Sequence, residues 1–411
     1  MISILEKGKP CIHGNSKNSN EYMRNSRLVN SEIEFTDKVN EIVAYNSAIR
    51  LSATAESCVY IPFDGTEIRK PFTEQSESLD KVQSLDGSWV NGYHTVSTIA
   101  VSDKSHEVTI LEHTIYSTKD FSKTKSDPNS KTEIYLDLLS STSARLKEVN
   151  PKLENVFLGD REFDNIRIMQ AIDDQGDKFV IRAKDNKRSV IRINNQLNPV
   201  ETVTVNKLKY KHKIIKKISE LKIKKRLYKN LTLKLSYETV EIKNSLGKTS
   251  EVTYISSILL DEDKKPVFKN DNFVLVTNKA IKTKDDAFQA YLNYFIRWKI
   301  ETVFKFLKTT LGLEKFRVPA MSAIKNMISL VFILGAYLIN LGEVEIDESY
   351  INILAKLGCG KGSVTPFYIR QGLQVLIHYV QAEEYLATLT TETSKELLDI
   401  VRKGRGRGYL C

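Results

Sequence analysis

The order of extended and helical segments between residues 58 and 183 limits the fold of this chain more than any other feature. The strand patterns occupy 58–62, 94–101, 107–116, 155–159 and 178–183, and the helical patterns occupy 131–148 and 163–174. The second and third strand patterns are separated by only five residues, as in an antiparallel pair. An antiparallel start followed by strand–helix–strand units predicts a mixed sheet with helices on its faces.

The residue pattern changes between residues 184 and 270. Thr, Val, Ile and Lys alternate there with a period of two, which predicts a β-rich insertion. The sheet of the core resumes at 272–277 with the apolar run FVLVT. Helical patterns then dominate, at 284–310, 321–341, 347–356 and 370–401.

The positive charge of the chain is concentrated in one window. Residues 206–234 contain twelve Lys or Arg residues and a single acid, whereas the whole chain carries a net charge of +10. A localised basic surface indicates a polyanionic partner, with nucleic acid before an anionic membrane. A solvated lysine-rich surface is an equally good interpretation of this window taken alone.

Cysteine usage and hydropathy favour a cytoplasmic protein. The cysteines are scattered without a CxxC pair, which indicates neither a zinc site nor a disulfide framework. The first residues lack the long apolar run of a signal peptide. The uncharged stretch at 326–342 is shorter than the roughly 20 apolar residues of a membrane span, so we expect a buried helix and no membrane partner.

Two aspartates follow predicted strands. Asp64 closes the first strand in IPFDGTEIRKP, and Asp160 closes a later strand in VFLGDREFD. Functional groups gather just beyond the carboxyl ends of strands in open α/β sheets. Asp and Gly also favour plain turns, and either aspartate taken alone fits that interpretation better.

A third acid lies in a helical segment at 291–312, YLNYFIRWKIETVFKFLKTTLG. With 3.6 residues per turn, an arc of roughly 60° on this helix contains Tyr294, Arg297, Glu301 and Lys308. Lys305 lies near the same arc, and apolar side chains cover the opposite face. Without the two aspartates, a surface helix with an Arg297–Glu301 ion pair would explain the pattern.

Taken together and in order, these residues resemble bacterial insertion-sequence transposases of the DDE class. The resemblance rests on DGT at Asp64, GDREFD at Asp160 and the run Y-x2-R-x3-E-x6-K from Tyr294 to Lys308, the signature of the Y-R-E-K branch (the IS-four type). It covers roughly residues 55–345. It implies an α/β fold with a ribonuclease-H-like mixed-sheet core, interrupted by a β-rich insertion and followed by C-terminal helices.

The resemblance also implies a site and a reaction. Asp64, Asp160 and Glu301 would be catalytic and would hold two Mg²⁺ ions, which Mn²⁺ can replace, because hard cations prefer carboxylate oxygens. The reaction would be metal-dependent cleavage at the ends of an insertion element, followed by strand transfer into target DNA. A homodimer would hold both element ends in a synaptic complex, close to the bacterial nucleoid.

Several basic residues and one tyrosine are candidate contacts to double-stranded DNA. From the signature these are Tyr294, Arg297 and Lys308, and beyond it Lys305, Arg182, Lys184, Lys209, Lys211, Lys224 and Arg226. Some members of the branch stack a tryptophan of the insertion on a flipped base. Residues 184–284 contain no Trp, so the stacking face would come from Tyr210, Tyr228, Tyr237 or Tyr254.

These patterns predict five regions and leave alternative functions open. The regions are an N-terminal arm and helix at 1–54, the first part of the core at 55–183, the basic insertion at 184–270, completion of the core at 271–345, and a helical region with a basic tail at 346–411. The 1–54 region is shorter than the DNA-binding region of the resembled branch. The alternatives to an active transposase are a ribonuclease-H-like DNA nuclease without strand transfer and a non-catalytic DNA-binding remnant.

Overall fold

The computed structural model describes most of the chain, in two compact units that are treated separately below. One unit comprises residues 35–304, and the other comprises 1–34 together with 305–411. The described residues are 10, 16, 18–31, 33–121, 130–184, 187–193, 201–208, 210, 212–223, 226–244, 247–268, 273–343, 348–359, 364–387 and 395.

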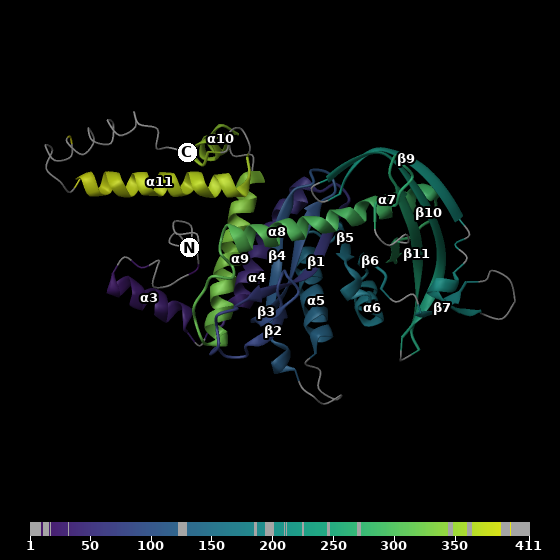
Figure 1. Ribbon diagram of the computed structural model, residues 1–411, viewed down its shortest axis with the longest axis horizontal. Coiled ribbons are helices and arrows are strands. Elements are labelled where there is room, and N and C mark those ends of the chain that lie inside the picture. The colour runs from purple at the N-terminus through teal and green to yellow at the C-terminus, as the bar shows by residue number, and fades with distance from the viewer. Residues whose placement is uncertain are drawn as a thin grey trace. The chain divides into compact units, whose positions relative to one another are not determined.

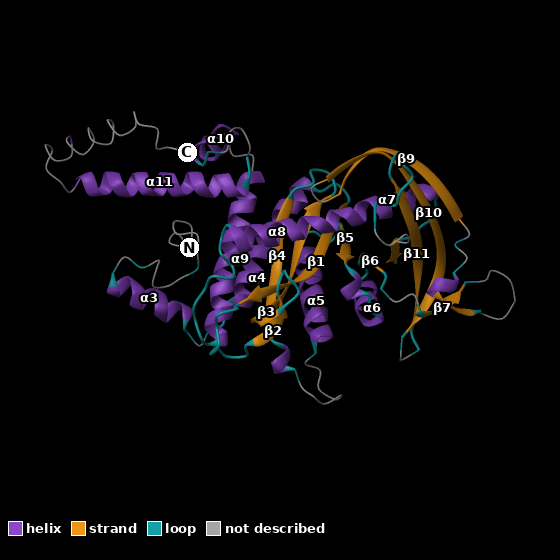
Figure 2. Cartoon of the chain, in the orientation of Figure 1, coloured by secondary structure: helices purple, strands orange, loops and turns teal. Residues whose placement is uncertain are grey.

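A large sheet organises the 35–304 unit (Figures 1 and 2). Over the described residues it has twelve strands, in the order β2-β3-β1-β5-β6-β12-β11-β10-β7-β8, with β4 paired to β3 and β9 paired to β10. The strands are β1 (Cys58–Arg69), β2 (Asp80–Gln83), β3 (Trp89–Ser102), β4 (Val108–Tyr116), β5 (Glu154–Gly159), β6 (Lys178–Arg182), β7 (Ser189–Arg192), β8 (Thr202–Thr204), β9 (His212–Ile223), β10 (Arg226–Lys243), β11 (Thr249–Leu260) and β12 (Phe273–Thr277).

Strand direction divides this sheet into a parallel centre and antiparallel flanks. β5 runs parallel to both β1 and β6, whereas the other pairs are antiparallel. The central strands are apolar runs buried on both faces, which is typical of parallel strands covered by helices. The mixed α/β architecture predicted from the sequence is therefore confirmed.

Helices cover the sheet, and some of them begin at residues whose side chains cap them. The helical elements of this unit are α4 (Thr36–Thr54), η1 (Thr118–Asp120), α5 (Lys131–Val149), η2 (Arg161–Phe163), α6 (Ile166–Asp174), η3 (Val205–Lys207), α7 (Lys284–Tyr294), η4 (Phe295–Trp298) and the start of α8 (Lys299–Thr309). The Ser130 hydroxyl caps α5 and the Asn165 side chain caps α6. On α4, the side chain of Asn40 exchanges two hydrogen bonds with the backbone of His113, at 2.8 and 3.1 Å, and so holds this helix on β4.

The β-patterned segment continues the central sheet. β10 and β11 form a long antiparallel pair whose burial alternates along β10, as the period of two predicts. β11 pairs with β12, and β12 pairs with β6, so the hydrogen-bonded ladder runs without a break from the centre of the sheet into this segment.

Three local differences separate the structure from the sequence predictions. The helix expected at 284–310 is divided, because the 3-10 turn η4 lies between α7 and α8. β2 and the N-terminal helix α3 (Ser19–Val29) were not predicted. The helix expected at 163–174 begins at Ile166, after the 3-10 turn η2. The end of the 370–401 pattern and the tail lie mostly outside the described residues.

The second unit is helical over its described residues. Besides α3, it contains α9 (Met321–Glu343), α10 (Glu348–Leu357) and α11 (Pro366–Ala387). The side chain of Asn326 on α9 donates to the backbone oxygens of Val29 and Ile33. α9 is long and apolar enough to cross a membrane, but 72% of its most apolar window is buried, as in the core helix of a soluble protein.

Candidate functional site

Asp64 lies where the pairing of β1 changes. The parallel pairing of β1 with β5 ends at Pro62, opposite Leu158, whereas its antiparallel pairing with β3 continues to Arg69. The prediction that Asp64 closes this strand at a turn is therefore wrong, because Asp64 and Gly65 remain extended along β3. Asp64 nevertheless stands beyond the last residue that β5 covers, where its side chain is only partly buried.

Asp160 follows β5 in the same register. It lies two residues after Leu158, as Asp64 lies two residues after Pro62, so the two aspartates stand side by side just beyond the last parallel pair of β1 and β5. The Oδ1 atom of Asp160 is buried and has no hydrogen-bond partner among the described residues. Arg182 at the end of β6 brings its Nη1 atom to 4.0 Å from this oxygen.

Aromatic packing holds the two strand ends together. The rings of Phe63 and Phe163 lie 4.4 Å apart, and the ring of Tyr135 lies 4.9 Å from that of Phe163. A Cβ atom at Gly159 would come within 2.7 Å of the Phe63 ring, so only glycine fits before Asp160. The glycine of the GDREFD motif thus has a packing role directly beside the site.

Glu301, the third acid, is linked to Asp64 by Arg297. Arg297 in η4 donates from Nη1 to Asp64 Oδ2 at 2.7 Å and from Nη2 to Glu301 Oε1 at 3.0 Å. The Arg297 side chain is only 5% exposed. The bond to Glu301 matches the ion pair considered from the sequence, but the bond to Asp64 spans 233 positions and could not be inferred from helical spacing.

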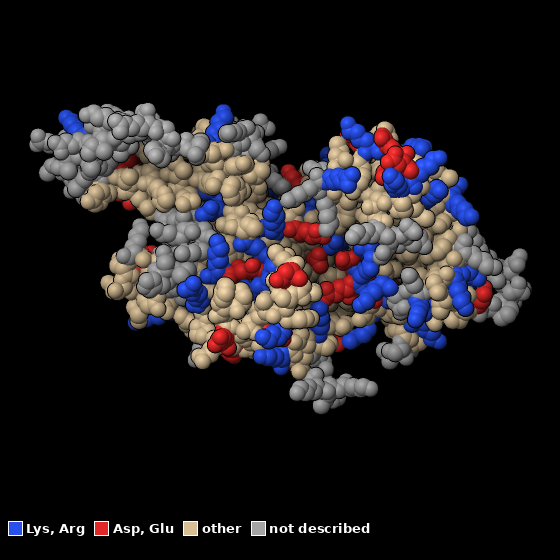
Figure 3. All heavy atoms as spheres, in the orientation of Figure 1, with Lys and Arg blue, Asp and Glu red and all other residues tan. Residues whose placement is uncertain are grey.

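Burial and neighbouring charges both act on the ionisable groups of the site. Burial raises the pKa of Asp64 to about 6; nearby Arg297 opposes this shift, and Asp160 and Glu301 add to it. Burial alone would lower the pKa of Arg297, but Tyr294 and the surrounding carboxylates raise it overall. Figure 3 shows acidic side chains gathered over the region of β1 and β5, with Lys and Arg side chains around them.

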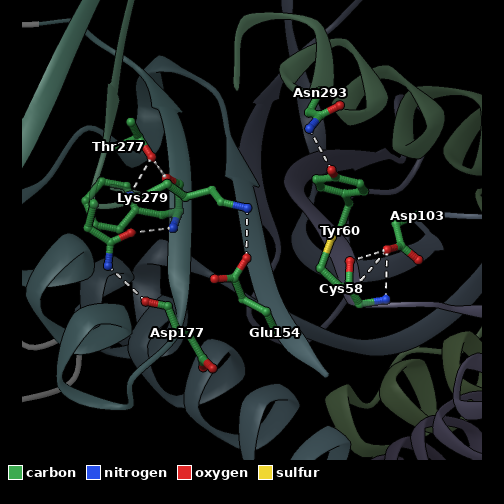
Figure 4. Close-up of polar contacts among 11 residues, drawn as sticks. Cys58, Tyr60, Asp103, Glu154, Asp177, Thr277, Lys279 and Asn293 are labelled. Carbon is green, nitrogen blue, oxygen red and sulfur yellow. Dashed lines mark hydrogen bonds and ion pairs between the residues drawn. The ribbon is translucent and has the colours of Figure 1, made fainter. Parts of the chain in front are cut away.

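A second contact fastens the segment that precedes Arg297 to β1 (Figure 4). The side-chain amide of Asn293, at the end of α7, donates to the Tyr60 hydroxyl at 2.6 Å. Tyr60 precedes Asp64 by four residues, and Asn293 precedes Arg297 by four. The segment that carries Arg297 and Glu301 is therefore bound to the strand that carries Asp64 at two points.

The chemistry of these donors fits a hard divalent cation, although the acids are arranged around Arg297. Among the residues that the structure describes, no group of three or more His, Cys, Asp or Glu side chains is close enough to hold a metal ion. Carboxylate oxygens are nevertheless the ligands that Mg²⁺ prefers. The buried Asp160 Oδ1 atom, which has no hydrogen-bond partner among the described residues, is free to accept a contact from such a cation.

Other residues of the 35–304 unit that were predicted to contact DNA differ in their exposure. Tyr294 is 2% exposed and packs edge-on against Phe273, with ring centroids 5.4 Å apart. Arg182 lies over the face of the same Phe273 ring, 4.5 Å from its centroid. Lys184 is exposed, and Arg226 is exposed beside Tyr228, 4.8 Å from its ring centroid.

The remaining candidates for DNA contact and base stacking differ in their positions. Lys305 and Lys308 lie in the other unit, where Lys305 is exposed and Lys308 pairs with Glu314 at 3.4 Å. Lys209, Lys211 and Lys224 lie outside the described residues. Of the four tyrosines considered for base stacking, Tyr237 and Tyr254 are buried, and Tyr210 and Tyr228 are partly exposed.

Two further acids, Glu162 and Asp164, lie next to the site. The buried carboxylate of Asp164 accepts from Arg188 at 2.5 Å and from the backbone of Lys184 at 2.6 Å, which ties the chain after β6 to the turn after Asp160. Glu162 pairs with Lys131 and accepts from the Tyr135 hydroxyl at 2.6 Å. Both acids belong to the GDREFD motif, where they resemble ordinary residues at the start of a helix.

Comparison with known families identifies the chain. The fold is a mixed α/β sheet with acids at the ends of its central strands and helices after it, which is consistent with the ribonuclease-H-like fold of transposases. The family model of the transposase DDE domain matches residues 60–338, more than half of the chain, so the chain belongs to this transposase family. DNA is the substrate that this membership implies. No curated protein sequence matches the chain.

Proposed function

We propose that this transposase cleaves DNA at the ends of an insertion element and joins those ends to target DNA, with Asp64, Asp160 and Glu301 as its catalytic residues. The observation that carries this proposal is the common register of Asp64 and Asp160 just beyond the last parallel pair of β1 and β5. Arg297 links Glu301 to the same place by contacting both Asp64 and Glu301. The run from Tyr294 to Lys308 supports membership of the Y-R-E-K branch.

The three carboxylates would hold two Mg²⁺ ions, or Mn²⁺ in their place. Such ions stabilise the attacking and the leaving oxygen of a phosphodiester and activate water or a 3′-hydroxyl. Asp64 would be a ligand together with Asp160 beside it, and Glu301 would be the third, because Arg297 contacts both Asp64 and Glu301. No covalent bond between protein and DNA is needed in this reaction.

DNA would approach the site along basic side chains at the ends of strands. Arg182 and Lys184 lie at the end of β6, beside Asp160, where they can contact phosphate without reading sequence. Arg297 and Lys308 of the signature, Lys305, and Arg226 with Lys209, Lys211 and Lys224 of the basic segment complete the proposed set. Tyr294 would act through Arg297, because its side chain is buried.

The five regions predicted from the sequence remain our proposal for the organisation of the chain. The 184–270 region would be the DNA-contacting insertion, and the 346–411 region would be a C-terminal helical region with a basic tail. We further propose that the transposase acts as a homodimer on two element ends in the bacterial cytoplasm, close to the nucleoid.

The proposal is tested by incubating the full chain with Mg²⁺ and DNA that carries the native element ends. We expect cleavage and then joining of 3′-hydroxyl ends to a second DNA. Asp64→Asn, Asp160→Asn and Glu301→Gln should each abolish both reactions while DNA binding survives. Cleavage without joining would indicate the nuclease alternative, and DNA binding without any cleavage by the unmodified chain would indicate the remnant.

A further inference from the structure

Arg297 occupies the place between two proposed cation ligands. Its guanidinium group donates to Asp64 at 2.7 Å and to Glu301 at 3.0 Å, with a side chain that is 5% exposed. The Nε atom of Arg297 is also buried and has no hydrogen-bond partner among the described residues. The two carboxylates and the neighbouring Tyr294 hydroxyl together orient the guanidinium.

Both oxygens of Asp64 have a donor in this arrangement. Oδ1 accepts from the backbone N–H of Gly65 at 2.9 Å, and Oδ2 accepts from Arg297. A divalent cation on Oδ2 would lie only a few ångströms from the guanidinium, where like charges repel strongly in a partly buried site. Cation and guanidinium therefore compete for this oxygen.

We propose that Arg297 is an exchangeable counter-ion of Asp64 and Glu301, which balances their charge in the metal-free enzyme and leaves Asp64 when a divalent cation binds. The inference rests on the proposed function, because that proposal places the cation at these carboxylates. It explains how acids brought together by the fold are tolerated before a metal ion arrives, since an unpaired buried charge is strongly destabilising. Because a divalent cation must displace Arg297 from Asp64, its measured affinity should be lower than it would be without this competitor.

The test is calorimetric titration of MnCl₂ into the full-length protein without DNA, combined with thermal unfolding in EDTA. Arg297→Gln removes the competitor, so we expect Mn²⁺ to bind about tenfold tighter or more than to the unmodified protein, the scale of a charge-assisted hydrogen bond. The same variant should unfold at a lower temperature in EDTA, and Mn²⁺ should restore most of the loss. Arg297→Lys keeps the charge and should give an intermediate affinity.

A matched control lies in the basic segment. Arg192 also spans two carboxylates, with Glu201 at 2.6 Å and Glu238 at 3.1 Å. Arg192→Gln therefore removes the same kind of contact away from the proposed ligands. It should leave the Mn²⁺ affinity unchanged.

The outcomes separate this inference from the proposed function. If Asp64→Asn fails to reduce Mn²⁺ binding, the proposed cation site itself is wrong. If Asp64→Asn removes binding but Arg297→Gln binds Mn²⁺ no tighter than the unmodified protein, only the exchange is contradicted. Should Arg297→Gln fail to fold, Arg297→Lys decides: an affinity equal to or weaker than that of the unmodified protein overturns the inference.

Discussion

The side-chain amide of Asn293 donates a hydrogen bond to the hydroxyl of Tyr60 across 2.6 Å. This bond joins the end of α7 to β1, four residues before each member of the Arg297–Asp64 pair. The 3-10 turn η4 follows immediately after this anchor. We infer that the hydrogen bond sets where η4 begins over the strand, and so where Arg297 and Glu301 lie.

Asn293→Ala should therefore reduce catalysis more than stability. We expect a loss of about 1 kcal/mol in the free energy of unfolding, measured in urea, because one hydrogen bond to a buried hydroxyl is removed. Cleavage should slow about tenfold or more, because small displacements of catalytic groups are costly. Asn46→Ala, which removes an exposed bond within α4, is the control. Unchanged cleavage in Asn293→Ala would show that the contact is only structural.

Gly159→Ala should damage the strand end that carries Asp160. The added Cβ would meet the Phe63 ring at 2.7 Å and Phe163 at 3.2 Å, so we expect a loss of about 1–3 kcal/mol from overpacking. Gly65→Ala is the matched control, because its Cβ would find only the Thr95 oxygen, at 3.7 Å. Equal unfolding free energies for the two variants would contradict the packing role of Gly159.

Asp164→Ala should destabilise the fold strongly. It leaves the buried guanidinium of Arg188 without its carboxylate, and breaking a buried pair in this way costs about 3–5 kcal/mol. Removing the exposed partner of Lys265 with Asp263→Ala should change the free energy of unfolding by less than about 0.5 kcal/mol. A small effect in both variants would mean that the Asp164–Arg188 pair does not hold the turn after Asp160.

A fall in pH should lower the free energy of unfolding, in part through His113. Complete burial lowers the pKa of this histidine to about 3, below its ordinary value of 6.5. The unfolded chain therefore binds more protons between pH 6.5 and pH 3, and this contribution to stability is lost as the pH falls through that window. Over this window His113 adds a slope that approaches about 1.4 kcal/mol per pH unit. Urea unfolding of His113→Gln should lack that part of the slope, and an identical pH profile would contradict the assignment.

Local patterns predicted much of this fold because they depend on neighbouring residues. The period of two at 184–270, the helical pattern at 131–148 and the apolar run before Asp160 all have the structures expected of them. The continuation of β1 beyond Asp64 could not be predicted in this way. It depends on pairing with β3, a partner about 30 residues away, which overrides the turn preference of Asp-Gly.

The site was predictable as a set of residues but not as a geometry. The motifs around Asp64, Asp160 and Glu301 identified the candidates, since each motif is local. Helical spacing suggested Arg297 as a partner of Glu301, yet its bond to Asp64 depends on the packing of η4 against β1. The same packing buries Tyr294, which a regular α-helix had placed on the exposed arc.

The central claim is that three acids from distant parts of the chain hold divalent cations against DNA. Its most direct test is anomalous scattering from Mn²⁺ in crystals of the full chain bound to DNA. We predict two peaks about 3.5–4 Å apart, with Asp64, Asp160 and Glu301 as their protein ligands. The absence of any Mn²⁺ peak at these carboxylates, with DNA in place, would contradict the account.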